Sequence, residues 1–497
     1  MATQAPAHEP VETSTEETID LIVVGAGFGG LGMAVHAARQ GLRFLVLERA
    51  DDVGGTWRDN IYPGVACDTQ SHHYSFSFAP NPDWSRRFAP GAEIHAYLRD
   101  TAQRFGLLPR IRFGCRVTEL RFDAGAAIWH VESNLGSFRA RAVVTATGQL
   151  TEPAFPPLSG LSEFTGPILH TARWDPGFSA AGKRIGVIGT GASAIQLVPE
   201  LAAEAGRLTL FQRSAPWMCP KNDRTFTEVE KRRFRRLPLW QRLYRYSIYW
   251  SWERSWPEFL DGSRKQKLRG EELLAWLETQ VSSPELRARM APDYPLGCKR
   301  VLLSDTFLPA LERENVELCT TAIRRIRPDG VELCDGRAVE LDALALATGF
   351  SAQEFLPGLS VTGAAGKELH EVWKDVGGAE GYLGMMVPGF PNFFMMYGPN
   401  TNLGHNSIVF MLECQAHFIS KALRRLFGSG RRTIAVGSSE MAAYQKRLQA
   451  ELARTAWAGN CTSWYKTGAD KITSNWSSNT VSYWLRSRLW PRRLRTD

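Results

Sequence analysis

The sequence predicts an α/β protein made of two Rossmann-like domains, with a helical insertion in the second. A glycine-rich turn between two apolar strands occurs twice, far apart in the chain. Each copy is followed later by an apolar strand that ends in Ala-Thr-Gly. A stretch rich in Arg, Trp and Tyr, with helical spacing and few glycines, lies between the second turn and the second tripeptide.

The first copy of the pattern begins with residues 21–24, a continuous apolar run of the kind found in parallel sheets. Residues 25–30 read Gly-Ala-Gly-Phe-Gly-Gly and match G-x-G-x-x-G. A helix rich in Ala and Leu follows, and the next strand, 44–47, ends at Glu48. Strand, turn, helix and acid therefore occur in the order that a dinucleotide site requires.

Each residue of this turn has an expected role. Gly25 permits the tight turn, Gly27 lets the backbone approach a pyrophosphate, and Gly30 lets helix and strand pack closely. The pyrophosphate would lie at the positive N-terminus of the helix. Glu48 can accept a hydrogen bond from a ribose hydroxyl, so this site is predicted to bind FAD or NAD.

The second copy comprises strand 184–188, a Gly-Thr-Gly-Ala-Ser-Ala turn, a helix and strand 208–211. In this turn the three glycine positions are taken by Gly189, Gly191 and Ala194.

The position equivalent to Glu48 holds Gln212, which is followed by Arg213 and Ser214. A carboxylate repels a 2′-phosphate, whereas Arg pairs with it, so the second site is predicted to bind NADPH. The alternative is a solvated Arg213 at the end of a strand.

These patterns predict the organisation of the chain. The tripeptides 146–148 and 347–349 are expected to return the chain past the two cofactors. The expected boundaries are a disordered tail at 1–18, an FAD-binding domain at 19–150 and 350–497, an NADPH-binding domain at 151–222 and 293–349, and a helical insertion at 223–292.

Composition limits the partners. The 497 residues carry a net charge of +8, which favours anionic partners. Since no nucleic-acid-binding module is recognisable, phosphorylated cofactors explain this charge and no nucleic acid partner is expected. The eight cysteines form no C-x-x-C pair, which excludes a dithiol redox centre and a zinc knuckle. No signal peptide is apparent, so we expect reduced thiols and a cytoplasmic protein.

Four motifs occur in proper order. Residues 164–175 match F-x-G-x-x-x-H-x-x-x-W-[P/D], residues 54–68 match G-G-x-W-x-x-x-x-[Y/F]-P-G-x-x-x-D, a Lys-Arg pair stands at 299–300, and Ser-Trp-Tyr stands at 463–465. They lie at the expected spacing, and this combination resembles the type I Baeyer–Villiger monooxygenases, the class B flavin enzymes. The similarity extends over roughly residues 19–480.

The resemblance implies FAD and NADPH as cofactors, and O₂ and a small-molecule ketone as substrates. The ketone would become an ester or lactone through a C4a-peroxyflavin, with sulfoxidation as a further activity. Two rival functions stay open. One is a heteroatom monooxygenase acting on amines or sulfides, against which Trp174-Asp175 argues. The other is an NADPH oxidase or flavin sensor without oxygenation.

The resemblance also assigns catalytic roles. Arg300 would hold the peroxide anion and the oxyanion of its ketone adduct, because a guanidinium stays charged and offers a fork of donors. Asp68 would border the flavin and position Arg300. The alternatives are a surface or phosphate-binding Arg300 and a loop-capping Asp68. His170 would link the domains rather than act in catalysis.

Further cofactor contacts are expected. Thr56 and Trp57 would line the FAD, and Lys299 would join Arg213 and Ser214 at the 2′-phosphate. Trp464 is expected on a segment that closes over the nicotinamide, the alternative being a core tryptophan.

The insertion raises one further question. Its basic run 231–236 and the aromatic residues that follow up to Trp252 are compatible with a membrane surface. Because Pro238 interrupts the run and the aromatic residues fall on several faces, we expect buried packing with a solvated basic face instead. The sequence leaves the oligomeric state open.

Overall fold

The computed structural model describes residues 17–428, 430–459, 465–467, 471–489 and 495–496. Trp464 and most of the expected N-terminal tail lie outside these residues. Strand β1 (Thr18–Val24) begins within the expected tail. Among the described residues, no helix is long and apolar enough to cross a membrane.

One eight-stranded mixed sheet contains the first glycine turn. Strand β1 is central and pairs in parallel with β2 (Phe44–Leu47) and β6 (Gly136–Thr145). Its buried Leu21–Val24 run is apolar because both faces of the sheet are covered. The outer members are β3 (Ile111–Arg112), β4 (Val117–Asp123), β5 (Ile128–Ser133), β17 (Ser360–Thr362) and β18 (Phe393–Met395).

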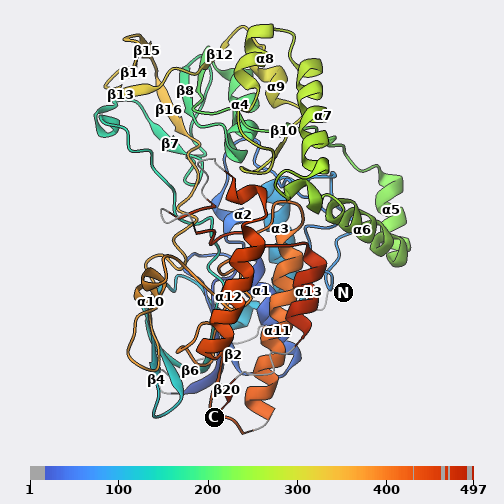
Figure 1. The fold of residues 1–497 in the computed structure, drawn as a ribbon, viewed down its shortest axis with the longest axis vertical. Coiled ribbons are helices and arrows are strands. Elements are labelled where there is room, and N and C mark those ends of the chain that lie inside the picture. Colours follow the sequence, from blue (N-terminus) through green and yellow to red (C-terminus); the bar gives the residue numbers. More distant parts are fainter. Residues whose placement is uncertain (1–16, 429, 460–464, 468–470, 490–494, 497) are drawn as a thin grey trace, which may run out of the picture.

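A five-stranded parallel sheet contains the second turn and lies at the other end of the molecule (Figure 1). Its order is β12 (Val316–Cys319), β9 (Arg207–Phe211), β8 (Arg184–Ile188), β16 (Ala343–Leu346) and β7 (Ile168–His170). A small antiparallel sheet accompanies it, formed by β13 (Ile323–Arg327), β14 (Gly330–Leu333) and β15 (Ala338–Glu340).

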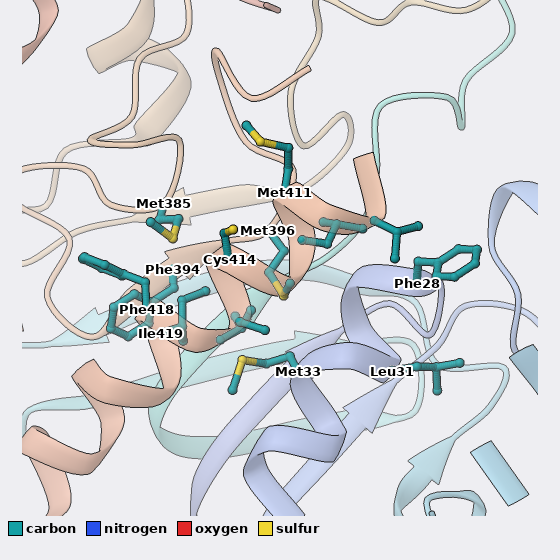
Figure 2. Close-up of a cluster of buried hydrophobic side chains, with 14 of the residues drawn as sticks. Phe28, Leu31, Met33, Met385, Phe394, Met396, Met411, Cys414, Phe418 and Ile419 are labelled. Carbon is teal, nitrogen blue, oxygen red and sulfur yellow. The ribbon is translucent and has the colours of Figure 1, made fainter. Parts of the chain in front are cut away.

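Helices cover the large sheet with segments from both ends of the chain. Helix α1 (Phe28–Arg39) packs against α11 (Ile408–Gly428), which in turn contacts α13 (Thr480–Arg488). Figure 2 shows Met33 of α1 among sulfur-containing and aromatic side chains from α11 and β18. The remaining helices of this part are α2 (Thr56–Asp59), α3 (Gly91–Arg104), α10 (Leu369–Asp375) and α12 (Ser438–Leu452).

The insertion is helical, as expected. It comprises α5 (Glu228–Arg236), α6 (Pro238–Glu253), α7 (Arg264–Gln280) and α8 (Pro284–Met290), whereas α4 (Ala192–Glu204) and α9 (Phe307–Leu311) pack on the five-stranded sheet. Pro238 occupies the first turn of α6, where its missing N–H costs no hydrogen bond. The predicted α/β class, with two Rossmann-like parts and a helical insertion, is confirmed.

Candidate active site

One cavity of about 1210 Å³ joins the two halves of the molecule. Both glycine turns and both Ala-Thr-Gly segments line it, because the carboxyl ends of the central parallel strands face it. The predicted site residues that line this cavity are Gly25, Gly27, Glu48, Thr56, Trp57, Asp68, Gly189, Gly191, Arg213, Ser214, Lys299 and Arg300.

In the first turn, Gly25 packs directly against the first tripeptide. Its φ is +104°, and a Cβ there would lie 2.7 Å from the Ala146 carbonyl oxygen. A Cβ on Gly30 would overlap the Gly25 carbonyl oxygen, so Gly30 serves packing and does not line the cavity. Gly27 is the N-cap of α1, and no side chain caps that helix. Its first N–H groups therefore suit an anion in the cavity.

The second turn repeats this geometry. Gly189 has φ +109°, and a Cβ would lie 2.5 Å from the carbonyl oxygen of Ala347 in the second tripeptide. Gly191 is the N-cap of α4, which also has no side-chain cap, and a Cβ there would meet nothing within 4 Å. Ala194 is fully buried in the core beneath the turn, where it replaces the third glycine in packing.

Glu48 is held at the mouth of the first turn. The residue is nearly fully buried at 4% exposure. One carboxylate oxygen accepts from the Ala26 N–H at 2.7 Å, and the other accepts from the Ala50 N–H at 3.0 Å. Arg58 donates to that second oxygen at 3.1 Å. The buried acid is thereby fixed beside the turn, facing the cavity.

At the second turn, two cations replace the acid. Lys299 donates from Nζ to Ser214 Oγ at 2.8 Å, and its Nζ lies 4.4 Å from the centre of the Tyr294 ring. Burial lowers the pKa of Lys299, and the positive charge of Arg213 lowers it further. Gln212 turns away and donates to the Arg289 carbonyl at 2.7 Å. The neighbouring cations suit an anionic ligand.

Arg300 and Asp68 form an ion pair on the cavity wall. Nε of Arg300 donates to Asp68 Oδ2 at 3.0 Å, and Nη2 donates to the same oxygen. Burial alone would raise the pKa of Asp68, but the charge and hydrogen bonds of Arg300 hold it below the usual value. Asp68 in turn raises the pKa of Arg300. The side chains are 36% and 26% exposed, so the pair is accessible to a ligand.

Three tyrosines around this pair were missed by the sequence reasoning. Tyr397 has φ +59° and donates to Asn402 Oδ1 at 2.9 Å, and Tyr465 is fully buried. Both affect the pKa of Arg300. Tyr74 accepts a hydrogen bond from Trp57 Nε1 at 3.2 Å. The sequence around Tyr397 gives no indication of contact with Arg300, because the two residues come together only in the folded chain.

His170 lies next to the second tripeptide rather than beside the Arg300–Asp68 pair. The imidazole of His170 is buried, with Nε2 3.3 Å from Thr348 Oγ1 in the second tripeptide.

Cys298 is disulfide-bonded, which contradicts the expectation that every thiol is reduced. The described cysteines that are free are Cys67, Cys115, Cys219, Cys319, Cys334 and Cys414.

Residues 22–237 match the family model described as pyridine nucleotide-disulphide oxidoreductase. A Baeyer–Villiger monooxygenase of Streptomyces coelicolor is 40% identical, with 96% of this chain and 91% of that protein covered. A Baeyer–Villiger monooxygenase of Pseudomonas aeruginosa is 41% identical, with 89% and 84% covered.

Solved structures agree with these sequence relatives. A steroid monooxygenase bound to NADP superposes with a TM-score of 0.84 at 29% identity, and a closed cyclohexanone monooxygenase with a TM-score of 0.85 at 27% identity. Each comparison covers 95% of this chain and 97% of the other. The chain therefore belongs to the FAD- and NADPH-dependent Baeyer–Villiger monooxygenases.

Proposed function

We propose that the protein oxidises a small-molecule ketone to an ester or lactone beside the Arg300–Asp68 pair. The overall reaction consumes one ketone, O₂, NADPH and a proton, and gives the ester, NADP⁺ and water. The observation that carries this proposal is an ion pair on the wall of a cavity that both glycine turns also line.

We assign FAD to the part that holds the eight-stranded sheet, and NADPH to the part that holds the five-stranded sheet. The uncapped N-termini of α1 and α4 each present backbone N–H groups to a pyrophosphate. Glu48 would accept from the FAD ribose, with Thr56 and Trp57 lining the cofactor. When bound, FAD accepts a hydride from NADPH and reacts with O₂.

Arg300 would stabilise the negative charge that the reaction places on oxygen. Its bonds to Asp68 use Nε and Nη2, so Nη1 remains as a donor for the attacking oxygen and for the former ketone oxygen. Such a fixed charge acts more strongly in a partly buried site than at an exposed surface, because water screens it less. Asp68 would be a positioning residue that fixes the guanidinium plane.

Lys299, Arg213 and Ser214 would bind the 2′-phosphate of NADPH. Supporting this, Lys299 and Arg213 lie close enough for the one charge to lower the pKa of the other. An anion between them would remove that repulsion. The cytoplasmic location stays a prediction, and a reaction that consumes NADPH supports it.

The test is a panel of linear and cyclic ketones, with an amine and a sulfide as comparisons, incubated with the purified flavoprotein, NADPH and ¹⁸O₂. We expect an ester or lactone that carries one labelled oxygen, formed in step with NADPH consumption. NADPH consumption that yields H₂O₂ and no ester from any ketone would overturn the proposal. Oxidation of the amine or sulfide alone would favour the heteroatom alternative.

A further inference from the structure

Helices α5 and α6 extend from the body of the molecule (Figure 1). One face of α6 is anchored: Gln241 donates to the Asn81 carbonyl at 2.8 Å, and Arg245 donates to the carbonyls of His72 and Ser75. At the far end, Tyr249 bonds Thr480 of α13 at 2.9 Å. These contacts fix the helix to the rest of the molecule through one face and leave the opposite face exposed to solvent.

That opposite face is apolar. Its exposed apolar residues from position 240 to 250 lie three or four positions apart, so they form one line along the helix, and Leu239 adjoins this line at its start. The line, here called the apolar stripe, consists of Leu239, Trp240, Leu243, Tyr246 and Trp250, whose exposed fractions range from 44% to 69%. The expectation that these aromatic residues are buried is wrong for Trp240, Tyr246 and Trp250. A contiguous exposed apolar surface of this kind marks an interaction site.

Cations flank the stripe. Helix α5 carries five basic and two acidic residues. Arg232, Arg233 and Arg236 are exposed, and in the described part of the chain no ion pair involves them. The Arg233 guanidinium lies 5.7 Å from the centre of the Trp240 ring, which ties the charge to the stripe. Trp484 and Leu485 of α13 add exposed apolar surface near the C-terminal end of α6, where Tyr249 contacts α13.

We propose that α5 and α6 dock the enzyme on the surface of an anionic phospholipid membrane. Leucine and tryptophan side chains on one helical face enter the boundary between headgroups and acyl chains, and flanking Arg residues pair with headgroup phosphates. A second copy of the chain fits less well, because a two-fold interface through the stripe would bring two arginine-rich α5 helices together. The positive charge beside the apolar stripe thus favours an anionic lipid surface over a second copy of this chain.

The experiment is co-sedimentation of the full-length holoenzyme with vesicles, either of phosphatidylcholine alone or containing about 30% phosphatidylserine, at low and high salt. We expect binding to the phosphatidylserine vesicles that weakens as salt rises. The Leu243→Gln/Trp250→Gln variant should lower the partition coefficient at least about tenfold, because each substitution removes an apolar side chain from the boundary. Arg232→Gln/Arg236→Gln should weaken binding to anionic vesicles only.

The matched control is Leu135→Gln/Val376→Gln, which removes apolar residues of similar exposure, 50% and 47%, far from α6. It should bind vesicles like the native protein. Ketone oxidation measured without vesicles should be unchanged in every variant, which verifies folding. Failure of the native protein to pellet with anionic vesicles overturns the proposal. Sedimentation velocity showing a native dimer that the stripe variant abolishes, without vesicle binding, would assign the stripe to a second copy instead.

Discussion

Arg300 donates to Asp68 across 232 positions of sequence, with Nε 3.0 Å from the carboxylate oxygen Oδ2. Asp68 follows the Gly54–Gly55 turn beside the first glycine motif, whereas Arg300 follows the helical insertion. The pair thus joins segments that fold around different sheets, and any motion of one part against the other acts on it directly.

Replacing Arg300 should separate oxygen transfer from NADPH consumption. In Arg300→Ala we expect FAD to stay bound and NADPH to be consumed, with ester formation lowered about 100- to 1000-fold, as when an oxyanion donor is removed. The missing product should appear as H₂O₂. Arg300→Lys keeps the charge but loses the fork of donors, so its loss should be smaller. Unchanged ester yield per NADPH in Arg300→Ala would contradict the assignment.

Asp68 should act through Arg300. Asp68→Ala leaves the guanidinium without its partner, and we expect kcat for the ketone to fall about tenfold through lost orientation. Asp68→Asn retains an acceptor oxygen and should recover part of that loss. Steady-state kinetics should show KM for NADPH unchanged in both variants, since we assign Asp68 to the FAD side of the cavity. An equal loss in both variants would point to charge rather than positioning.

The cations at the second turn should determine the choice of nicotinamide cofactor. Arg213→Ala should lower kcat/KM for NADPH about 10- to 100-fold, the worth of one charge-assisted hydrogen bond, with NADH unaffected. Arg207→Ala, which changes an exposed residue at the start of β9, the strand that precedes Arg213, is the control. Loss on both cofactors alike would contradict the 2′-phosphate role.

The same site predicts a pH effect. Because burial and Arg213 lower the pKa of Lys299, this residue loses its proton at a lower pH than an ordinary lysine. The preference for NADPH over NADH should therefore decline as pH rises through that lowered pKa. The ratio of the two kcat/KM values, measured from neutral pH upward in the native enzyme and in Lys299→Met, checks this. Only the native ratio should change.

Gly191 should control binding of NADPH, whereas Gly189 should control the stability of the fold. Gly191 has an ordinary φ of −80°, and a Cβ added there would meet nothing within 4 Å. The Tm of Gly191→Ala without cofactor should therefore equal that of the native protein. Its methyl group would stand where the pyrophosphate approaches, raising KM for NADPH about tenfold. Gly189→Ala, with φ +109° and the Ala347 oxygen in the way, should lower Tm itself. Similar NADPH kinetics for Gly191→Ala and the native enzyme would refute this.

The glycine turns, their strands and the tripeptides could be predicted from the sequence because their signals are local. A φ near +100° requires glycine, and a buried parallel strand requires a continuous apolar run. The pairing of each turn with its own tripeptide follows from strand order, and Gly25 against Ala146 and Gly189 against Ala347 show it.

Other features depend on distant segments and left no local signal. Tyr397 and Tyr465 come close to Arg300 only through tertiary packing. The exposed face of α6 was misjudged because a helix with aromatic residues on several sides does not reveal which side is packed. The family motifs identified Asp68 and Arg300, whereas periodicity alone would have left both as ordinary polar residues.

Glu253 at the end of α6 supplies the last prediction. Its carboxylate is buried and accepts from Thr480 Oγ1 at 2.6 Å, Asn406 Nδ2 at 2.8 Å and the Val481 N–H at 3.0 Å, with His405 Nε2 3.4 Å away. Burial alone would raise the pKa of Glu253, but His405, Thr480 and the Val481 N–H lower it to about 2. The cluster joins the insertion to the 397–407 segment, through His405 and Asn406, and to α13, through Thr480.

Because this pKa lies below that of the unfolded chain, Glu253 contributes stability above about pH 4.5 that is lost as pH falls toward 2. The shift corresponds to about 3 kcal/mol at neutral pH. Glu253→Gln should therefore lower Tm clearly at neutral pH, and the difference from the native protein should shrink to less than half near about pH 3. Glu278→Gln, an exposed residue on α7, is the control and should leave Tm unchanged at both pH values. A difference between Glu253→Gln and the native protein that does not depend on pH would show that packing, rather than the ionised carboxylate, holds α6 in place.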